Sequence, residues 1–394
     1  YAVWGAWLIS LGAYLGNTLK FDGLQIGSFF ATMGIASLFM PAVMGIIADR
    51  WIPAQRLLGL CHLFAAGFIT LAATRTDYNS LYTLVLLSVM FYMPTIALSN
   101  SVAYNALEKA GLDTVTHFPP IRVWGTVGFI CAMWVVDLGK MGLSATQLYF
   151  SATLGLILGL YSFTLPNCPI NRSGGGKSIV DLLGLRAFAL FKQRKMAIFF
   201  IFSMLLGMSL QITNAFADGY IKSFGDTGIH GAKYLGTFGV EHSTILISLS
   251  QISETLCILL IPFFLKRFGI KRVMLIAMFA WVLRFALLGA GNPGPGVWMF
   301  ILSMIVYGVA FDFFNISGSL FVEKETSAAI RSSAQGVFMI MTNGLGALIG
   351  SYLAGWIVNH YGWPLSWYLF AGFSLVVAIV FAVIFKYKHD PNRI

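Results

Sequence analysis

Apolar stretches of about 20 residues recur along the whole chain, separated by short breaks that contain charged residues, glycine or proline. An α-helix needs about 20 residues to cross the hydrocarbon core of a bilayer. The pattern predicts twelve spans, near residues 1–19, 24–48, 57–73, 80–105, 120–138, 146–165, 196–217, 243–265, 271–290, 296–321, 334–358 and 366–386. We therefore expect an all-α membrane protein with little structure outside the helical bundle.

The composition agrees with this pattern. The 394 residues are 58% hydrophobic and only 10% charged, whereas a soluble domain carries roughly 25% charged residues. Four cysteines, Cys61, Cys131, Cys168 and Cys257, lie far apart and form neither a disulfide framework nor a metal-binding CxxC motif. The chain starts at Tyr1 inside an apolar segment, so we expect the first helix to be slightly truncated.

The longest polar interval, Pro166 to Lys195, separates six predicted spans from the next six. The expected organisation is a half at 1–165, a linker at 166–195 and a second half at 196–394. The composition of the "NRSGGGKS" segment predicts a flexible linker. The following "SIVDLLGLRAFALFKQRK" segment predicts a helix on the membrane surface or an ordinary connecting helix. Two sets of six spans indicate parallel pseudo-repeats.

Lysine and arginine are distributed unequally between the two sides of the predicted bundle. One side, which includes the linker and the C-terminus, receives 18 of them and the other side receives 5. Because basic residues accumulate on the cytoplasmic side, both termini and the linker are predicted to be cytoplasmic. This distribution also accounts for the net charge of +10, so we do not expect nucleic-acid binding.

Two acidic residues lie inside predicted spans. Glu254 is near the middle of the eighth span and Asp312 is well inside the tenth. An ionisable side chain at membrane depth is costly and is by default a functional candidate. The structural alternative is a buried ion pair, with Arg284 as the partner of Asp312 and Arg122 as the partner of Glu254.

Other polar and aromatic residues repeat at helical spacing near these acids. They are Arg122, Thr126 and Phe129 on the fifth span, Gln211 and Asn214 on the seventh, Gln251 beside Glu254 on the eighth, and Tyr307 and Phe311 on the tenth. Amides, a guanidinium, a carboxylate and aromatic faces together suit a flat, polar, neutral solute. A nucleoside fits this set and a sugar fits nearly as well, so the residues alone leave both open.

Catalytic and nucleotide-hydrolysing motifs do not occur in the chain. It contains no G-x-x-x-x-G-K-[ST], no H-E-x-x-H and no G-x-S-x-G. We therefore expect a protein that is not an enzyme and that needs no cofactor or metal. A channel or a receptor for such solutes stays open beside a carrier.

Specific stretches carry a family resemblance. The loop at 41–56 resembles a degenerate major facilitator superfamily motif that keeps Gly45, Asp49, Arg50 and Arg56. "FPPIRVWGTVGFICAMWVV", "MAIFFIFSMLLGMSLQITN", "SQISETLCILLIPFFLKRFGIK" and "LSMIVYGVAFDFFNISGSLFVEKE" resemble bacterial nucleoside:proton symporters within that superfamily. The resemblance implies a twelve-helix major facilitator fold and proton-coupled nucleoside uptake across the bacterial cytoplasmic membrane, with no obligate protein partner.

The resemblance also implies site roles. Nucleoside binding falls to Arg122, Thr126, Phe129, Gln211, Asn214, Gln251, Glu254, Tyr307 and Phe311, and proton coupling to Glu254 or Asp312. The alternatives are a proton-coupled sugar carrier of the same fold and a receptor or channel that does not accumulate its solute. The preferred nucleosides, the choice of coupling acid, the oligomeric state and the role of the external loop at 218–242 stay open.

Overall fold

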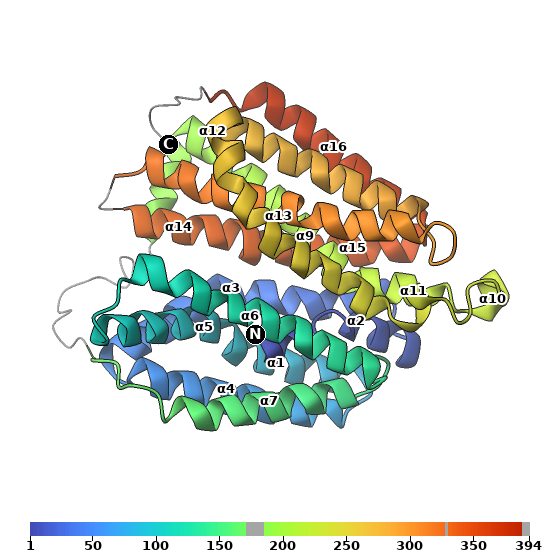
Figure 1. The fold of residues 1–394 in the computed structure, drawn as a ribbon, viewed down its shortest axis with the longest axis horizontal. Helices are drawn as coiled ribbons and strands as arrows, with labels where there is room; N and C mark the ends of the chain where they lie inside the picture. The colour runs from blue at the N-terminus through green and yellow to red at the C-terminus, as the bar shows by residue number, and fades with distance from the viewer. Residues whose placement is uncertain (171–184, 328–329, 388–394) are drawn as a thin grey trace.

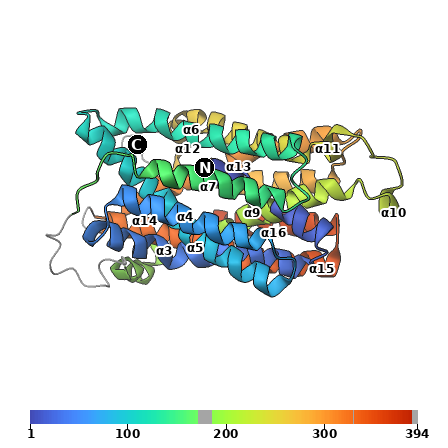
Figure 2. The same cartoon turned by 90° about the horizontal axis from the view of Figure 1, so that it is seen from below.

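The computed structural model describes residues 1–170, 185–327 and 330–387, and all regular structure in these ranges is helical. The first group of helices is α1 (Ala2–Gly5), α2 (Leu11–Ala13), the π-helix η1 (Tyr14–Thr18), α3 (Gly23–Arg50), α4 (Ala54–Ala73), α5 (Tyr78–Lys109), α6 (Thr114–Leu138) and α7 (Thr146–Ser162). The second group is the 3₁₀-helix η2 (Leu185–Lys192), α9 (Arg194–Ser223), α10 (Thr227–His230), α11 (Phe238–Glu241), α12 (Ser243–Ala290), α13 (Val297–Glu325), α14 (Arg331–Met339), the π-helix η3 (Ile340–Gly346), α15 (Ala347–Tyr361) and α16 (Leu365–Ile384). Figure 1 shows the two groups as separate bundles, one above the other. Their long helices run along a common direction, and α10 projects from one end of the molecule (Figure 2).

Nine helical segments in the described ranges are long and apolar enough to cross a membrane. The three remaining predicted spans fall in helices that are broken, shorter or merged with a neighbour. The first span is broken into α1, α2 and η1, α7 has only 17 residues, and α12 contains both the eighth and the ninth predicted span. Gly269 separates the two parts of α12 with a φ of 77°, a conformation that glycine adopts without steric cost.

Helix α3 illustrates how the sequence sets the ends of a span. Asp22 caps it, because its side chain accepts from the Gln25 backbone N–H at 2.7 Å while the Gln25 side chain accepts from the Asp22 N–H at 3.1 Å. The helix ends at Arg50. We call the end of the bundle at Arg50 the linker end, and the opposite end, where α3 begins at Gly23, the loop end.

One expected span boundary differs from the structure. The seventh span was expected to end at 217, but α9 continues to Ser223 and places Asp218 inside the helix, where it is 1% exposed. Asp218 accepts hydrogen bonds from Lys222 at 2.6 Å and from Ser243 at 2.5 Å, so its partners stabilise a buried charge that looks like a loop residue in the sequence. Of the expected surface helix at 178–195, residues 178–184 lie outside the described residues, and the described part forms the 3₁₀-helix η2 and the beginning of α9.

The two groups of helices are in close contact at the loop end. A Cβ atom added to Gly27 of α3 would clash with the carbonyl oxygen of Ser351 on α15, and one added to Gly23 would lie 2.8 Å from the carbonyl oxygen of Gly355. The Gly23 N–H donates to Asn359 Oδ1 at 2.5 Å. Small residues therefore allow α3 and α15 to approach backbone to backbone, as small residues do at membrane helix interfaces.

A second contact at the loop end joins α6 with the beginning of α12. His242 Nδ1 lies 2.6 Å from Asp137 Oδ2, and the Asp137 side chain is 2% exposed. One turn further along the helices, Trp134 Nε1 donates to Ser248 Oγ at 2.8 Å. Polar contacts on one side and glycine contacts on the other therefore close the space between the groups at this end.

Candidate binding cavity

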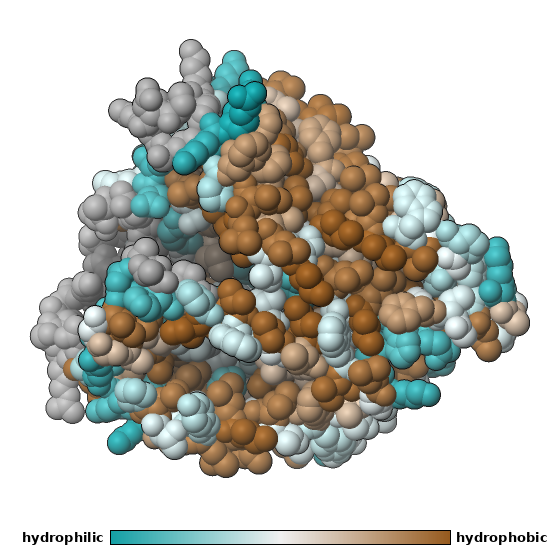
Figure 3. Space-filling view, viewed as in Figure 1, coloured by the Kyte–Doolittle hydropathy of each residue, from teal (hydrophilic) through white to brown (hydrophobic). Residues whose placement is uncertain are grey.

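A cavity of about 1160 Å³ lies between the two groups of helices. Its wall includes Pro41 and Ala42 near the Arg50 end of α3, and Ile330 and Ser333 at the beginning of α14. These residues lie toward the linker end, whereas the contacts at the loop end close the opposite side. The molecular surface is hollowed between the two groups beside hydrophilic residues at one end (Figure 3). As far as the described residues show, the cavity is therefore accessible from the linker end.

The structure brings the predicted binding residues together in this cavity. All nine line it: Arg122, Thr126, Phe129, Gln211, Asn214, Gln251, Glu254, Tyr307 and Phe311. The first three come from α6 in one group and the other six from α9, α12 and α13 in the other group. Residues spread over about 190 positions of sequence thus face one volume.

Two stacked aromatic rings of α13 lie in the cavity wall. The Tyr307 and Phe311 rings are 5.6 Å apart and nearly parallel, at 5°. Trp281 meets the Tyr307 ring edge-on at 6.0 Å, and the Arg284 guanidinium lies 4.7 Å from the ring centre. Arg284 is 2% exposed, and its Nη1 donates to the Ser303 carbonyl at 2.7 Å. Its fixed guanidinium therefore supports the Tyr307 ring.

Charged and amide groups surround this aromatic surface. Arg122 stacks on the Tyr1 ring at 3.9 Å, and Glu254 lines the same cavity from the other group of helices. Asn214 Nδ2 approaches Gln211 Oε1 at 3.5 Å, a weak contact that leaves most of the hydrogen-bonding capacity of both amides for a ligand. The cavity therefore offers one cation, one carboxylate and several amides around a stacking face.

The two ion pairs considered as structural alternatives are not formed. Arg122 and Glu254 make no salt bridge with each other, and Arg284 donates to the Ser303 carbonyl instead of to Asp312. Asp312 is 5% exposed, does not line the cavity, and its Oδ2 atom has no hydrogen-bond partner among the described residues. A buried carboxyl oxygen without a partner is costly for the charged form, so this site suits an acid that binds and releases a proton.

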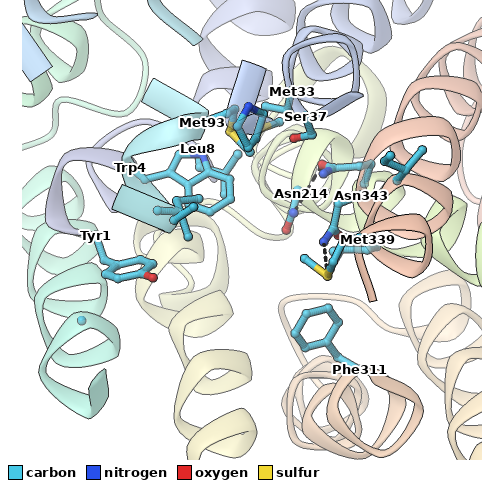
Figure 4. Close-up of a pocket in the computed structure, with 18 of the residues that line it drawn as sticks. Tyr1, Trp4, Leu8, Met33, Ser37, Met93, Asn214, Phe311, Met339 and Asn343 are labelled. Atoms are coloured by element: carbon cyan, nitrogen blue, oxygen red, sulfur yellow. Dashed lines mark hydrogen bonds between the residues drawn. The ribbon is translucent and has the colours of Figure 1, made fainter. Parts of the chain in front are cut away.

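The cavity also contains residues that sequence reasoning missed. Tyr1, Trp4, Ser37, Met93, Met339 and Asn343 belong to its wall, and Figure 4 shows them beside Asn214 and Phe311. Single serines, methionines and asparagines in apolar helices carry no periodic signal, so only the packing of the helices identifies them. In the described part of the chain, His, Cys, Asp and Glu side chains form no group of three that could hold a metal ion.

The chain is similar in sequence to known membrane transport proteins. A family model described as "Nucleoside H+ symporter" matches residues 1–390. Nucleoside permease NupG of Escherichia coli (strain K12) is 50% identical over 396 residues, covering 99% of this chain and 94% of that protein. Xanthosine permease of the same organism is 50% identical over 401 residues, covering 100% of this chain and 95% of that protein.

Solved structures agree with these relatives. A crystal structure of a variant of the nucleoside transporter NupG superposes with a TM-score of 0.94 at 50% identity, over 98% of this chain and 97% of that chain. A bacterial homologue of the lysosomal transporter Spinster, at 12% identity and a TM-score of 0.67 over 97% of this chain and 93% of that chain, shares the fold alone. The molecule is a multi-pass inner-membrane protein with the major facilitator fold, and it belongs to the nucleoside H+ symporter family.

Proposed function

We propose that the protein takes up nucleosides together with protons by alternating access. The observation that carries the proposal is the cavity between the two groups of helices, open at one end and closed by direct contacts at the other. A carrier needs a site that each side reaches in turn. The relatives named as nucleoside and xanthosine permeases support nucleosides as the substrate class.

The proposed substrate contacts follow from the chemistry of the wall. The base stacks on the aromatic pair of Tyr307 and Phe311, because both residues line the cavity and their rings lie parallel to each other. Glu254 and Gln251 accept hydrogen bonds from ribose hydroxyls, because a carboxylate and an amide oxygen are strong acceptors. The remaining predicted contacts come from Arg122, Thr126, Phe129, Gln211 and Asn214.

The proposal also covers the orientation of the protein in the membrane and the division of the chain into two halves. The linker end, both termini and the linker are cytoplasmic, since most lysines and arginines lie there. The structure is then open to the cytoplasm. Residues 1–165 and 196–394 form two halves of six spans joined by the linker at 166–195, and transport is a rocking of one half against the other.

Proton coupling is proposed to use the two intramembrane acids. A proton taken from the outside neutralises a buried carboxylate, so the loaded site can close without burying a net negative charge. Opening to the cytoplasm rehydrates the cavity that Glu254 and Arg122 both line, so water can solvate the carboxylate again and the proton can leave. In this scheme the proton and the nucleoside enter and leave together.

The direct test is uptake of radiolabelled uridine and adenosine into proteoliposomes with an imposed inward proton gradient. Excess unlabelled maltose serves as the competitor for the sugar alternative. We expect accumulation that collapses with the gradient and ignores the sugar. Absence of accumulation and of counterflow with both nucleosides would overturn the proposal, and competition by maltose would favour a sugar carrier.

Removing the stacking face should weaken binding more than it affects folding. Stacking of one base on an aromatic side chain is worth about 1–3 kcal/mol, so Phe311→Ala is expected to raise the Kd for uridine by about 5- to 150-fold. Isothermal titration of the purified protein measures this. Phe263→Ala, which removes a ring that is 65% exposed and outside the cavity, is the matched control and should leave the Kd unchanged.

Weakening the contact between Asp137 and His242 should favour the state open at the loop end. The His242 side chain is 35% exposed, so the pair contributes about 1 kcal/mol or less. Asp137→Asn is expected to raise the ratio of open to closed molecules up to about five-fold. Spin labels at Arg75 and His360, exposed positions at the loop end of the two groups, report the ratio by electron double resonance.

The control for this measurement is Asp226→Asn. Asp226 caps the short helix α10 at the same end, and asparagine is an equally good cap. It should not change the distance distribution. A wild-type distribution in Asp137→Asn would mean that the pair does not hold the closed state.

A further inference from the structure

One polar side chain of the cavity wall lies on an unusual backbone. Asn343 belongs to the π-helix η3, Ile340–Gly346, which interrupts the span formed by α14 and α15. π-helical turns are rare and occur frequently at functional sites. Asn343 lines the cavity, and Figure 4 shows its side chain in that space, joined by a dashed line to Met339.

The backbone around Asn343 is held against the other group of helices. A Cβ atom added to Gly344 would lie 2.7 Å from the Leu38 side chain of α3, and one added to Gly34 would lie 2.7 Å from the Gly344 carbonyl oxygen. Ser37, which precedes Leu38, also lines the cavity. Each half thus contributes one uncharged polar residue next to a tight interhelical contact.

Both side chains have unused hydrogen-bonding capacity. Asn343 Nδ2 approaches only the Met339 sulfur atom, at 3.7 Å, and thioether sulfur is a weak acceptor. Among the described residues, Ser37 Oγ and Asn343 Oδ1 have no hydrogen-bond partner, whereas Ser28 on the same helix α3 donates to the Gln25 carbonyl. An amide and a hydroxyl that face a cavity without protein partners are available to a ligand.

Their position relative to the stacking face indicates which part of a ligand they meet. Asn343 and Phe311 also border a second, small recess, so the amide lies next to the ring on which a base would stack. Arg122 and Glu254 come from other helices, α6 and α12. The wall therefore has an uncharged polar region beside the stacking ring, distinct from the charged region.

We propose that Asn343, supported by Ser37, reads the hydrogen-bonding edge of the nucleobase and so determines base specificity. An asparagine amide presents one donor and one acceptor side by side, which matches the paired donor and acceptor on the edge of a base. The ribose is left to Glu254 and Gln251. This inference rests on the proposed nucleoside transport and adds to it the residues that discriminate among bases.

The test is competition in uridine counterflow. Proteoliposomes loaded with unlabelled uridine receive radiolabelled uridine, with uridine, cytidine, inosine or 2′-deoxyuridine as competitors, for the wild type, Asn343→Ala, Asn343→Asp and Ser37→Ala. We expect Asn343→Ala to change the uridine to cytidine inhibition ratio by about 5-fold or more, since one bidentate base contact discriminates by roughly 5- to 150-fold. Asn343→Asp should shift the ratio toward cytidine, because a carboxylate accepts from the cytosine amino group.

The ratio of uridine to 2′-deoxyuridine should stay as in the wild type for every variant. Ser37→Ala should change the base ratio in the same direction as Asn343→Ala and by less. If Asn343→Ala does not fold, Asn343→Asp and Ser37→Ala carry the test. Unchanged base ratios, or a changed ribose to deoxyribose ratio, would overturn the inference, while absence of uridine exchange in the wild type would overturn the proposed function itself.

Discussion

Asp312→Asn is expected to abolish proton-driven accumulation of nucleoside while leaving exchange of internal for external nucleoside intact. Asp312 is buried, has an unpartnered oxygen and does not line the cavity. Asparagine imitates the protonated acid in shape and in neutrality, so the loaded protein can still close and open. What it cannot do is bind and release a proton, so the step that couples transport to the gradient is lost.

The size of this effect follows from the driving force. A gradient of one pH unit is worth about 1.4 kcal/mol per proton, which supports about tenfold accumulation. In proteoliposomes that are acidic outside, the wild type should approach that ratio and Asp312→Asn should stay near one. Asp77→Asn is the matched control, because Asp77 caps α5 in an exposed loop and asparagine is an equally good cap.

Glu254→Gln separates the second acid from the first. Glu254 lines the cavity, so its loss should weaken substrate binding as well as coupling. Hydrogen bonds to charged groups are worth about 1.5–3 kcal/mol, so we expect the Kd for uridine to rise by about 10- to 150-fold. Wild-type accumulation in both variants would exclude these acids from coupling.

Gly27→Leu is expected to reduce transport to about a tenth of the wild-type rate or less. In the closed loop end, even a Cβ atom at Gly27 clashes with the Ser351 carbonyl oxygen. A leucine forbids this approach, and overpacking at such a contact cannot be relieved by a rotamer change, because the obstacle is backbone. The protein should remain folded but stay open at the loop end, since the proposed transport cycle requires α3 and α15 to separate there.

Three measurements check this result. Counterflow gives the transport rate, size-exclusion chromatography reports folding, and the spin-label pair at Arg75 and His360 should show a longer mean distance than in the wild type. Gly67→Leu is the matched control, since nothing lies within 4 Å of a Cβ atom added there. Transport close to wild type in Gly27→Leu would mean that the contact of α3 with α15 is not part of the cycle.

Several features of the site could be predicted because each leaves a local signal. Glu254 and Asp312 stand out in apolar spans, and Gln251 lies three residues before Glu254 on the same helix face. The stacked pair of Tyr307 and Phe311 follows from a spacing of four residues. Such signals depend on one helix at a time, so they are readable without knowing how the helices pack.

Other features carry no local signal. Ser37 and Asn343 are single polar residues in apolar surroundings, and they face a cavity only because Leu38 and Gly344 pack together across the halves. Asp218 looks like a loop residue in the sequence, but it is buried inside the bundle and accepts hydrogen bonds from Lys222 and Ser243. Arg284 was considered as a partner of Asp312 but supports Tyr307 instead.

The hydrophobic pattern alone predicts that the protein lies in a membrane, how many spans it has and which charged residues are unusual. The reason is that each crossing of a bilayer needs about 20 apolar residues, and a charged residue within it is energetically costly. The cavity, its open and closed ends and the contacts of each acid depend on which helix faces meet. Those faces are chosen by small residues such as Gly23 and Gly27 and by pairs such as Asp137 and His242. Whether two helices approach closely depends on the surfaces of both helices, and the sequence of one helix does not specify which helix it contacts.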